Sequence, residues 1–211
     1  MGFEYFQRNQ KMMLAGIVAV AFFISLAVSF SLRIPIFADS RAYDAIAINL
    51  VLRHEYREIS DGPLNQDRAI TRIGPGYEFF LAGVYVLFGH HQEAVWVLQA
   101  LFHALTVLLV FLIARLLFYD SLWHPIVSIV AASFVAFSPD LIMASSMLLA
   151  ENVAIFLLTL MTLLSFRYWK NQKTFLAVLL GFVFGIGVLV RTPLAILLVF
   201  FAVFFLLSHP I

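Results

Sequence analysis

Repeated long apolar runs are the feature of this sequence that most constrains its fold. The first run, from Met12 to Leu32, has about the 20 residues that an α-helix needs to cross a bilayer. A cleavable signal peptide has a shorter apolar region of about 7–15 residues, so we expect an uncleaved membrane helix here. Of the 211 residues, 63% are hydrophobic and 12% are charged, whereas soluble domains carry about 25% charged residues. The sequence therefore predicts an all-α fold, a polytopic transmembrane helical bundle.

Further apolar runs bring the predicted number of spans to about six. They cover Ala94–Phe118, Ile126–Phe137, Leu148–Trp169, Phe175–Val190 and Leu194–Leu207. The run Tyr77–Phe88 is too short for a span, so we expect an interfacial or re-entrant helix there. Backbone groups in lipid must be satisfied within their own segment, and long unbroken runs favour helices over barrel strands.

The basic residues predict how the bundle is oriented. In this topology the lysines and three arginines lie on one side of the membrane, at Lys11, Lys170, Lys173, Arg8, Arg115 and Arg167. The positive-inside rule then places the N-terminus in the cytoplasm, and residues 33–93 form a first extracytoplasmic loop with juxtamembrane helices. Because the sequence stops at the end of an apolar run with no polar tail, we expect residues 1–211 to be one transmembrane domain from the N-terminal part of a longer protein.

Net charge and cysteine content exclude several classes of function. The formal net charge is +1, so no strongly basic field indicates binding to nucleic acid. The chain has no cysteine, which excludes disulfides, thiolate catalysis and cysteine metal sites.

The stretch "FADSRAYDAIAINL" after the first apolar run contains two acids, Asp39 and Asp44. Helical spacing predicts an amphipathic helix on the membrane surface, with an apolar face of Tyr43, Ile46, Ala47, Leu50 and Val51. In the simplest interpretation Asp39 or Ser40 is the N-cap of this helix. We expect Asp44 to be a residue of the polar face, near Arg41.

A Gly74-Pro75-Gly76 sequence predicts a tight turn before the short apolar helix, with Arg72 and Tyr77 beside it. An arginine suits a phosphate because its planar guanidinium donates to two oxygens at once. The alternative for Arg72 is a side chain that reaches up to lipid headgroups.

Two acids and one arginine complete the polar groups on the predicted outer side. Glu151 lies near the start of the Leu148–Trp169 run. An ionisable group at membrane depth is expensive and therefore indicates function. The alternative is favourable placement near a helix N-terminus. Asp140 follows Ser138 and Pro139 at the outer surface, and Arg191 lies in the turn between the last two runs.

The sequence resembles the N-terminal half of the polyprenol-phosphate-sugar-dependent glycosyltransferases of the GT-C type. This superfamily includes protein O-mannosyltransferases and lipid A aminoarabinose transferases. The likeness lies in the order and spacing of "ADSRAYDAIAINL", "TRIGPGYEFFLAGVYVLFG", "LQALFHALTVLLVFLIARLLF", "SPDLIMASSMLLAEN" and "GIGVLVRTPLAILL". One departure is Asp39-Ser40, where several members have an Asp-Glu pair.

The resemblance implies a catalytic role for Asp39 as general base, and places Asp140 or Glu151 as acids of the same cavity. It implies that Arg72, Tyr77 and Arg191 hold the donor phosphate. The expected reaction moves a sugar from a polyprenyl-phosphate donor to a hydroxyl of a protein, lipid or glycan acceptor, outside the membrane and with inversion. A divalent cation is compatible with these carboxylates, but no ligand cluster demands one. The expected location is a prokaryotic plasma membrane.

Two other classes of function compete with a transferase. Membrane carboxylates also serve transporters, although the polar residues here gather at the outer surface rather than at the midplane. A non-catalytic scaffold is the third class, and Gly181 and Gly185 form a GxxxG that suits helix contacts. His90 and His91 do not predict a metal site, because no third ligand is placed by spacing.

Overall fold

The described residues form helices joined by short connections, which confirms the all-α prediction. The computed structural model describes residues 2–59, 67, 74–200 and 203, and the side chains from residue 9 onward. The helices are α1 (Gly2–Leu32), α2 (Asp39–Arg53), α3 (Gly76–Phe88), α4 (Gln92–Leu117), α5 (His124–Ala136), α6 (Pro139–Ser146), α7 (Ala150–Asn171) and α8 (Thr174–Val190). A 3-10 helix follows at Thr192–Ile196. None of the described residues forms a strand.

Three helices are long and apolar enough to cross a membrane, namely Asn9–Leu32 within α1, α4 and α7. Helices α5 and α6 are long and apolar enough to cross a membrane only when taken together, and they are bent by 46° relative to each other. Counting this pair as one span gives four spans. The apolar helices α3 and α8 are shorter. The predicted span from Leu194 begins as the 3-10 helix, and its end lies outside the described residues.

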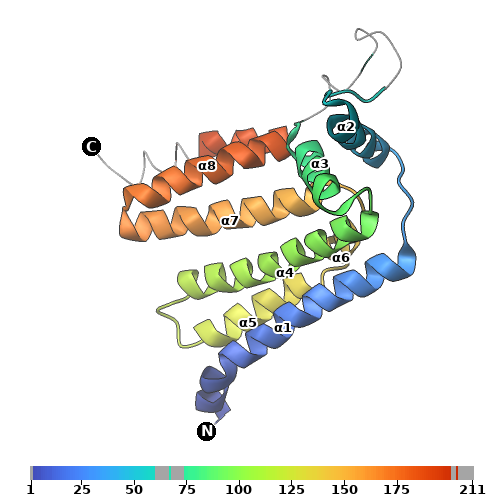
Figure 1. Cartoon of the computed structure of the whole chain (residues 1–211). Coiled ribbons are helices and arrows are strands. Elements are labelled where there is room, and N and C mark those ends of the chain that lie inside the picture. The colour runs from blue at the N-terminus through green and yellow to red at the C-terminus, as the bar shows by residue number, and fades with distance from the viewer. Residues whose placement is uncertain (1, 60–66, 68–73, 201–202, 204–211) are drawn as a thin grey trace.

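Helix α4 is the centre of the bundle. It packs against α1 and α5 on one side and against α7 on the other, and α7 in turn carries α8 (Figure 1). One apolar cluster joins α1, α4 and α5 around the buried Val107 and Ala132. A larger cluster joins α2, α3, α4, α7 and α8 around the buried Tyr77 and Met161.

A ladder of buried polar side chains fixes α1 against α4, α5 and α6. Ser25 Oγ lies 2.7 Å from His103 Nδ1, and His103 Nε2 lies 3.2 Å from the carbonyl oxygen of Val135. Because a carbonyl only accepts, Nε2 carries the proton and Nδ1 accepts from Ser25. Ser29 Oγ donates to Ser146 Oγ over 3.1 Å. His103 is therefore a hydrogen-bonded packing residue, as expected of a polar group buried among apolar helices.

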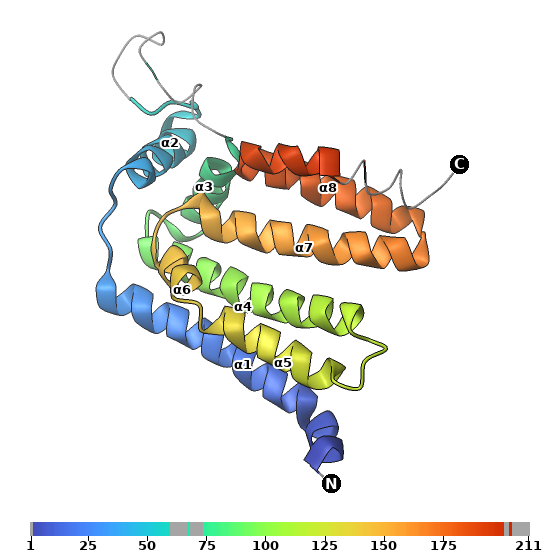
Figure 2. The same cartoon turned by 180° about the vertical axis from the view of Figure 1, so that it is seen from behind.

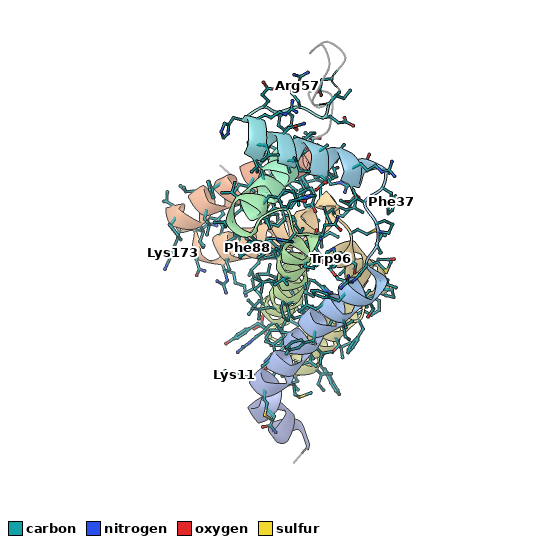
Figure 3. The ribbon with its side chains drawn as sticks, turned by 45° about the vertical axis from the view of Figure 1, so that its right-hand side comes forward. Lys11, Phe37, Arg57, Phe88, Trp96 and Lys173 are labelled. Atoms are coloured by element: carbon teal, nitrogen blue, oxygen red, sulfur yellow. The ribbon has the colours of Figure 1, made fainter. Side chains whose placement is uncertain are left out.

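The bundle has two chemically different ends. Helices α2, α3 and α6 gather at one end, which we call the α2–α3 end, and α6 lies against the ends of α1 and α4 there (Figure 2). The α4–α5 and α7–α8 turns lie at the opposite end (Figure 1). Figure 3 shows Lys11 near the start of α1 and Phe37 beyond its end. We call the opposite end the basic end, since it carries Lys11, Arg115, Arg167, Lys170 and Lys173.

The GxxxG of α8 does not pack inside the described chain. A Cβ built on Gly181 or Gly185 would meet nothing within 4 Å. Gly187 faces the interior instead, where its Cβ would lie 3.1 Å from the terminal methyl of Met161.

Candidate active site

Asp39 is the first residue of α2, and its side chain is exposed. The N-cap position belongs to Ala38, so the prediction that Asp39 or Ser40 caps the helix is wrong. Ala38 has a φ of 47° and a ψ of −124°, a backbone conformation that costs a non-glycine residue about 1–3 kcal/mol. This bend ends the extended connection from α1 and begins α2 with a carboxylate in its first turn.

Tyr43 shows which charged groups share the space around Asp39. It follows Asp39 by four residues, so both lie on one face of α2. Burial raises the pKa of Tyr43 above its usual value, and the negative charges of Asp39, Glu151 and Glu78 raise it further. Arg191 acts in the opposite direction. The phenol therefore stays protonated and can donate a hydrogen bond, and charges from four separate segments converge on it.

Glu151 and Arg191 form an ion pair between Arg191 Nη1 and Glu151 Oε1. Glu151 lies in the first turn of α7, and Arg191 joins α8 to the 3-10 helix. Both side chains are about 40% exposed, so the pair contributes little to stability and remains accessible. We call Asp39, Tyr43, Glu151 and Arg191 the outer cluster.

The predicted glycine turn holds α3 directly against the end of α8. Gly74 has a φ of 82°, which favours glycine. A Cβ on Gly76 would lie 2.7 Å from the backbone nitrogen of Val190, a distance that no side chain could occupy. This close approach fixes the segment immediately before Arg191. Arg72 lies outside the described residues, two positions before Gly74.

Tyr77 is fully buried and connects α3 to the segment that leads into α7. Its hydroxyl donates to Gln99 Oε1 over 3.1 Å. Gln99 Nε2 in turn donates to the carbonyl oxygens of Met147 over 2.8 Å and Ser145 over 3.2 Å. In this conformation Tyr77 orients the start of α7, where Glu151 lies, rather than facing the open side of the cluster.

Asp140 occupies a different place from the other predicted acids. It is exposed in the first turn of α6 and lines a groove of about 690 Å³ with Phe134, Phe137 and other residues of α5 and α6. It is not among the described charges that act on Tyr43. The charges of Asp39, Glu151 and Arg191 thus all act on Tyr43, whereas Asp140 lies on the α5–α6 side.

Asp44 is not the exposed polar-face residue that the sequence predicts. Only 9% of its surface is exposed, because α3 packs against this side of α2. Asp44 Oδ1 accepts from the hydroxyl of Tyr85 over 2.6 Å and lies 2.9 Å from His90 Nε2. Arg41, the expected neighbour, instead donates to the carbonyl oxygen of Ile36. We call Asp44, Tyr85 and His90 the inner cluster.

Tyr43 and Glu78 are two residues of this region that the sequence did not single out as site candidates. Tyr43 was expected on the apolar face of its helix, although its four-residue spacing from Asp39 is a signal that the two act together. Glu78 is completely buried in the first turn of α3 and accepts from the hydroxyl of Tyr56 over 3.4 Å. A carboxylate inside a 13-residue apolar helix is the signal that could have identified it.

The described residues contain no group of three or more histidine, aspartate and glutamate side chains that could hold a metal ion. The two exposed acids of the outer cluster offer oxygen ligands of the kind that hard cations prefer, but they do not make a complete site. A divalent cation therefore remains a sequence-based expectation.

Comparison with known proteins identifies the family. Residues 72–211, more than half of the chain, match the family described as dolichyl-phosphate-mannose-protein mannosyltransferase. No curated protein matches the chain. Glu151 and Arg191 lie inside the matched segment, and Asp39 precedes it. With its spanning helices, the chain is an integral membrane glycosyltransferase that belongs to the dolichyl-phosphate-mannose-protein mannosyltransferase family.

Proposed function

We propose that this protein transfers a sugar, mannose or a related one, from a polyprenyl-phosphate donor to an acceptor hydroxyl. The convergence of Asp39, Glu151 and Arg191 around Tyr43 carries the proposal. These residues supply an accessible carboxylate, a guanidinium and a neutral phenol at one end of the bundle. Transfer of a sugar from a phosphate uses groups of these kinds, as a base and as ligands of the phosphate.

Asp39 is the general base in this proposal. Its carboxylate takes the proton of the acceptor hydroxyl while that oxygen attacks the anomeric carbon. The bond from the anomeric carbon to the phosphate oxygen breaks in the same displacement, and the pair of electrons leaves with the polyprenyl phosphate. A single displacement of this kind inverts the anomeric centre.

Arg191 stabilises the charge that grows on the departing phosphate, since its fixed guanidinium is positioned before the reaction begins. Glu151 orients that guanidinium through their ion pair. Arg72 and Tyr77 are proposed as further ligands of the donor phosphate. Asp140 is proposed as a second acid of the cavity, after Glu151. No step requires a divalent cation, and the effect of a chelator on the transfer rate tests whether one assists.

The α2–α3 end faces the outside of the membrane in this proposal. The basic end then faces the cytoplasm, as the positive-inside rule requires, and the membrane is a prokaryotic plasma membrane. The polyprenyl chain of the donor lies along the apolar helices, and the acceptor is a protein, a lipid or a glycan that approaches from the outside.

The experiment measures transfer by the complete protein in proteoliposomes. Labelled mannosyl polyprenyl phosphate is compared with labelled GDP-mannose, with a simple alcohol acceptor, and Asp39→Asn serves as the variant. We expect transfer from the lipid-linked donor alone, with the rate in Asp39→Asn lower by about 10²- to 10⁴-fold, the contribution of a general base. Transfer from GDP-mannose, or full activity of Asp39→Asn, would contradict the proposal. Movement of the donor across the bilayer without transfer would favour a transporter.

A further inference from the structure

A second polar site lies at the basic end of the bundle, between α4 and α7. A pocket of about 240 Å³ is lined there by Leu112, Arg115, Leu116, Tyr119, Leu163 and Arg167. On α4 the lining residues are three and four positions apart, and on α7 they are four apart, so each helix presents one face to the pocket. The two faces meet because α4 and α7 pack against each other and end on the same side.

The pocket holds two guanidinium groups for which the described residues provide no ion-pair partner. Arg115 and Arg167 are both exposed, and within the part of the chain that the structure describes neither forms an ion pair. Lys170, one helical turn after Arg167, adds a third cation at the rim. Its Nζ donates to the carbonyl oxygen of Leu116 over 3.4 Å and lies 5.7 Å from the centre of the Tyr119 ring.

The helix ends explain part of this positive charge but not its arrangement. Cations are favourable near helix C-termini, typically by about 0.3–1 kcal/mol each, and both α4 and α7 end here. Basic residues that point in any direction from the last turn would gain this interaction with the helix C-terminus. Two arginines that line one pocket, beside a held lysine, point to an anionic ligand with several oxygens.

The surroundings place the pocket at the boundary between lipid and water. Tyr119, Trp123 and Trp169 are exposed at this end by 67%, 65% and 46%, and exposed tyrosine and tryptophan mark the headgroup level of a membrane. Leu112, Leu116 and Leu163 form the apolar part of the pocket lining, which we call the leucine wall. Leu112 and Leu163 lie about one helical turn nearer the middle of the bundle than Arg115 and Arg167. A ligand with a phosphate at headgroup level and an apolar part below it would match both halves.

We propose that this pocket binds the phosphate of an anionic phospholipid headgroup. Arg115 and Arg167 each donate to the phosphate oxygens, Lys170 contributes at the rim, and the leucine wall contacts the start of an acyl chain. The site is separate from the outer cluster, at the opposite end of α4 and α7. Basic pockets between membrane helices are suited to such headgroups, whereas a free phosphate ion would gain nothing from the leucine wall.

The test compares lipid retention by the purified full chain and by two double variants. Each protein is reconstituted with phosphatidylglycerol and phosphatidylcholine of identical acyl chains, and the bound lipids are counted by native mass spectrometry. Arg115→Gln with Arg167→Gln removes the pocket charges. Lys11→Gln with Lys173→Gln removes the same charge from the same end, outside the pocket.

We expect the arginine pair to lower the preference for phosphatidylglycerol by about 10-fold or more, since each arginine loses charge-assisted hydrogen bonds to the phosphate oxygens. The lysine control should retain the preference of the unmodified protein. An equal loss in both pairs would show a diffuse charge effect and overturn the site. An unchanged preference in the arginine pair would also overturn it.

Two further measurements test the identity of the ligand and replace the glutamine pair if it does not fold. Millimolar inorganic phosphate should leave the bound phosphatidylglycerol in place, and its displacement would assign the pocket to free phosphate instead. If the glutamine pair does not fold, Arg115→Lys with Arg167→Lys keeps the charge but loses the two-oxygen geometry. We expect that pair to weaken retention by about fivefold, and retention equal to the unmodified protein would count against the proposal.

Discussion

Asp39 and Asp44 lie five residues apart in α2, and the fold gives their carboxylates opposite surroundings. Asp39 is exposed, and its charge acts on Tyr43 together with the charges of Glu151 and Arg191. Asp44 is buried and is held by Tyr85 and His90. Five residues correspond to a rotation of about 140° around a helix, so the two carboxylates point to different neighbours. Position on the helix, rather than residue type, decides which acid is available for chemistry.

The two clusters also differ in how far their polar contacts contribute to stability. In the inner cluster, burial and the bond to Asp44 raise the pKa of Tyr85 above its usual value, so this phenol remains a donor. A buried carboxylate needs such donors, because an unpaired one would be expensive. The outer cluster has an ion pair that is partly open to water, which adds little stability. The inner cluster therefore joins α2 to α3, whereas the outer cluster is partly exposed to water.

Removing the guanidinium of the outer cluster should have a large effect on donor binding. Arg191→Gln should raise the KM for the lipid-linked donor by about 10- to 100-fold, because a hydrogen bond to a charged group contributes about 1.5–3 kcal/mol. The measurement is steady-state transfer against donor concentration. Glu151→Gln is the matched variant and should change the KM less, since the ion pair itself is partly exposed. An unchanged KM in Arg191→Gln, together with lower stability, would make the arginine structural and weaken the contrast between the clusters.

The glycine turn offers a way to disturb the outer cluster without touching its charges. Gly76→Ala would push against the backbone of Leu189 and Val190, and overpacking of this kind costs about 1–3 kcal/mol. We expect a lower free energy of unfolding, measured by SDS titration followed by circular dichroism, and a raised donor KM because Arg191 shifts.

Gly181→Ala is the control for that variant, since nothing lies within 4 Å of the added methyl group. Alanine is favoured over glycine in a helix interior by about 1 kcal/mol, so this variant should lose no stability and no activity. Equal behaviour of the two variants would show that the turn does not set the position of Arg191.

The smallest expected effect belongs to the inner cluster. Asp44→Asn keeps the shape and one acceptor oxygen but removes the charge that strengthens the bonds from Tyr85 and His90. The free energy of unfolding should fall by about 1 kcal/mol, the difference between charged and neutral hydrogen bonds. Transfer per mole of folded protein should stay within about twofold. A loss of transfer with no loss of stability would instead assign Asp44 to the active site.

Local signals were sufficient to predict much of this arrangement. The all-α fold followed from the apolar runs, the turn at Gly74 from its glycine-proline pattern, and the position of Arg191 from the proline that follows it. Each of these depends on a few neighbouring residues or on the length of a run. The predicted number of spans is less well supported, because α8 has only 17 residues and the last run is described only in part.

The parts that could not be predicted depend on contacts between distant segments. Asp44 meets residues 41 and 46 positions away, and helical spacing alone cannot reveal that α3 covers this side of α2. The surroundings of Tyr43 include the charges of Glu151, in α7, and Arg191, just after α8, and these are distant from it in the sequence. The N-cap was predicted at Asp39 or Ser40 from residue preference, but the bend at Ala38 starts the helix with Asp39 already inside it.

The most direct test of the central claim compares Asp39→Asn with Asp44→Asn in one assay. Both variants replace a carboxylate of α2 by its neutral isostere, and each is measured for transfer per mole of folded protein and for free energy of unfolding. We predict that Asp39→Asn loses transfer by about 10²- to 10⁴-fold with unchanged stability, and that Asp44→Asn loses stability and retains transfer. Retained transfer in Asp39→Asn, or loss of transfer in Asp44→Asn at full stability, would contradict the account.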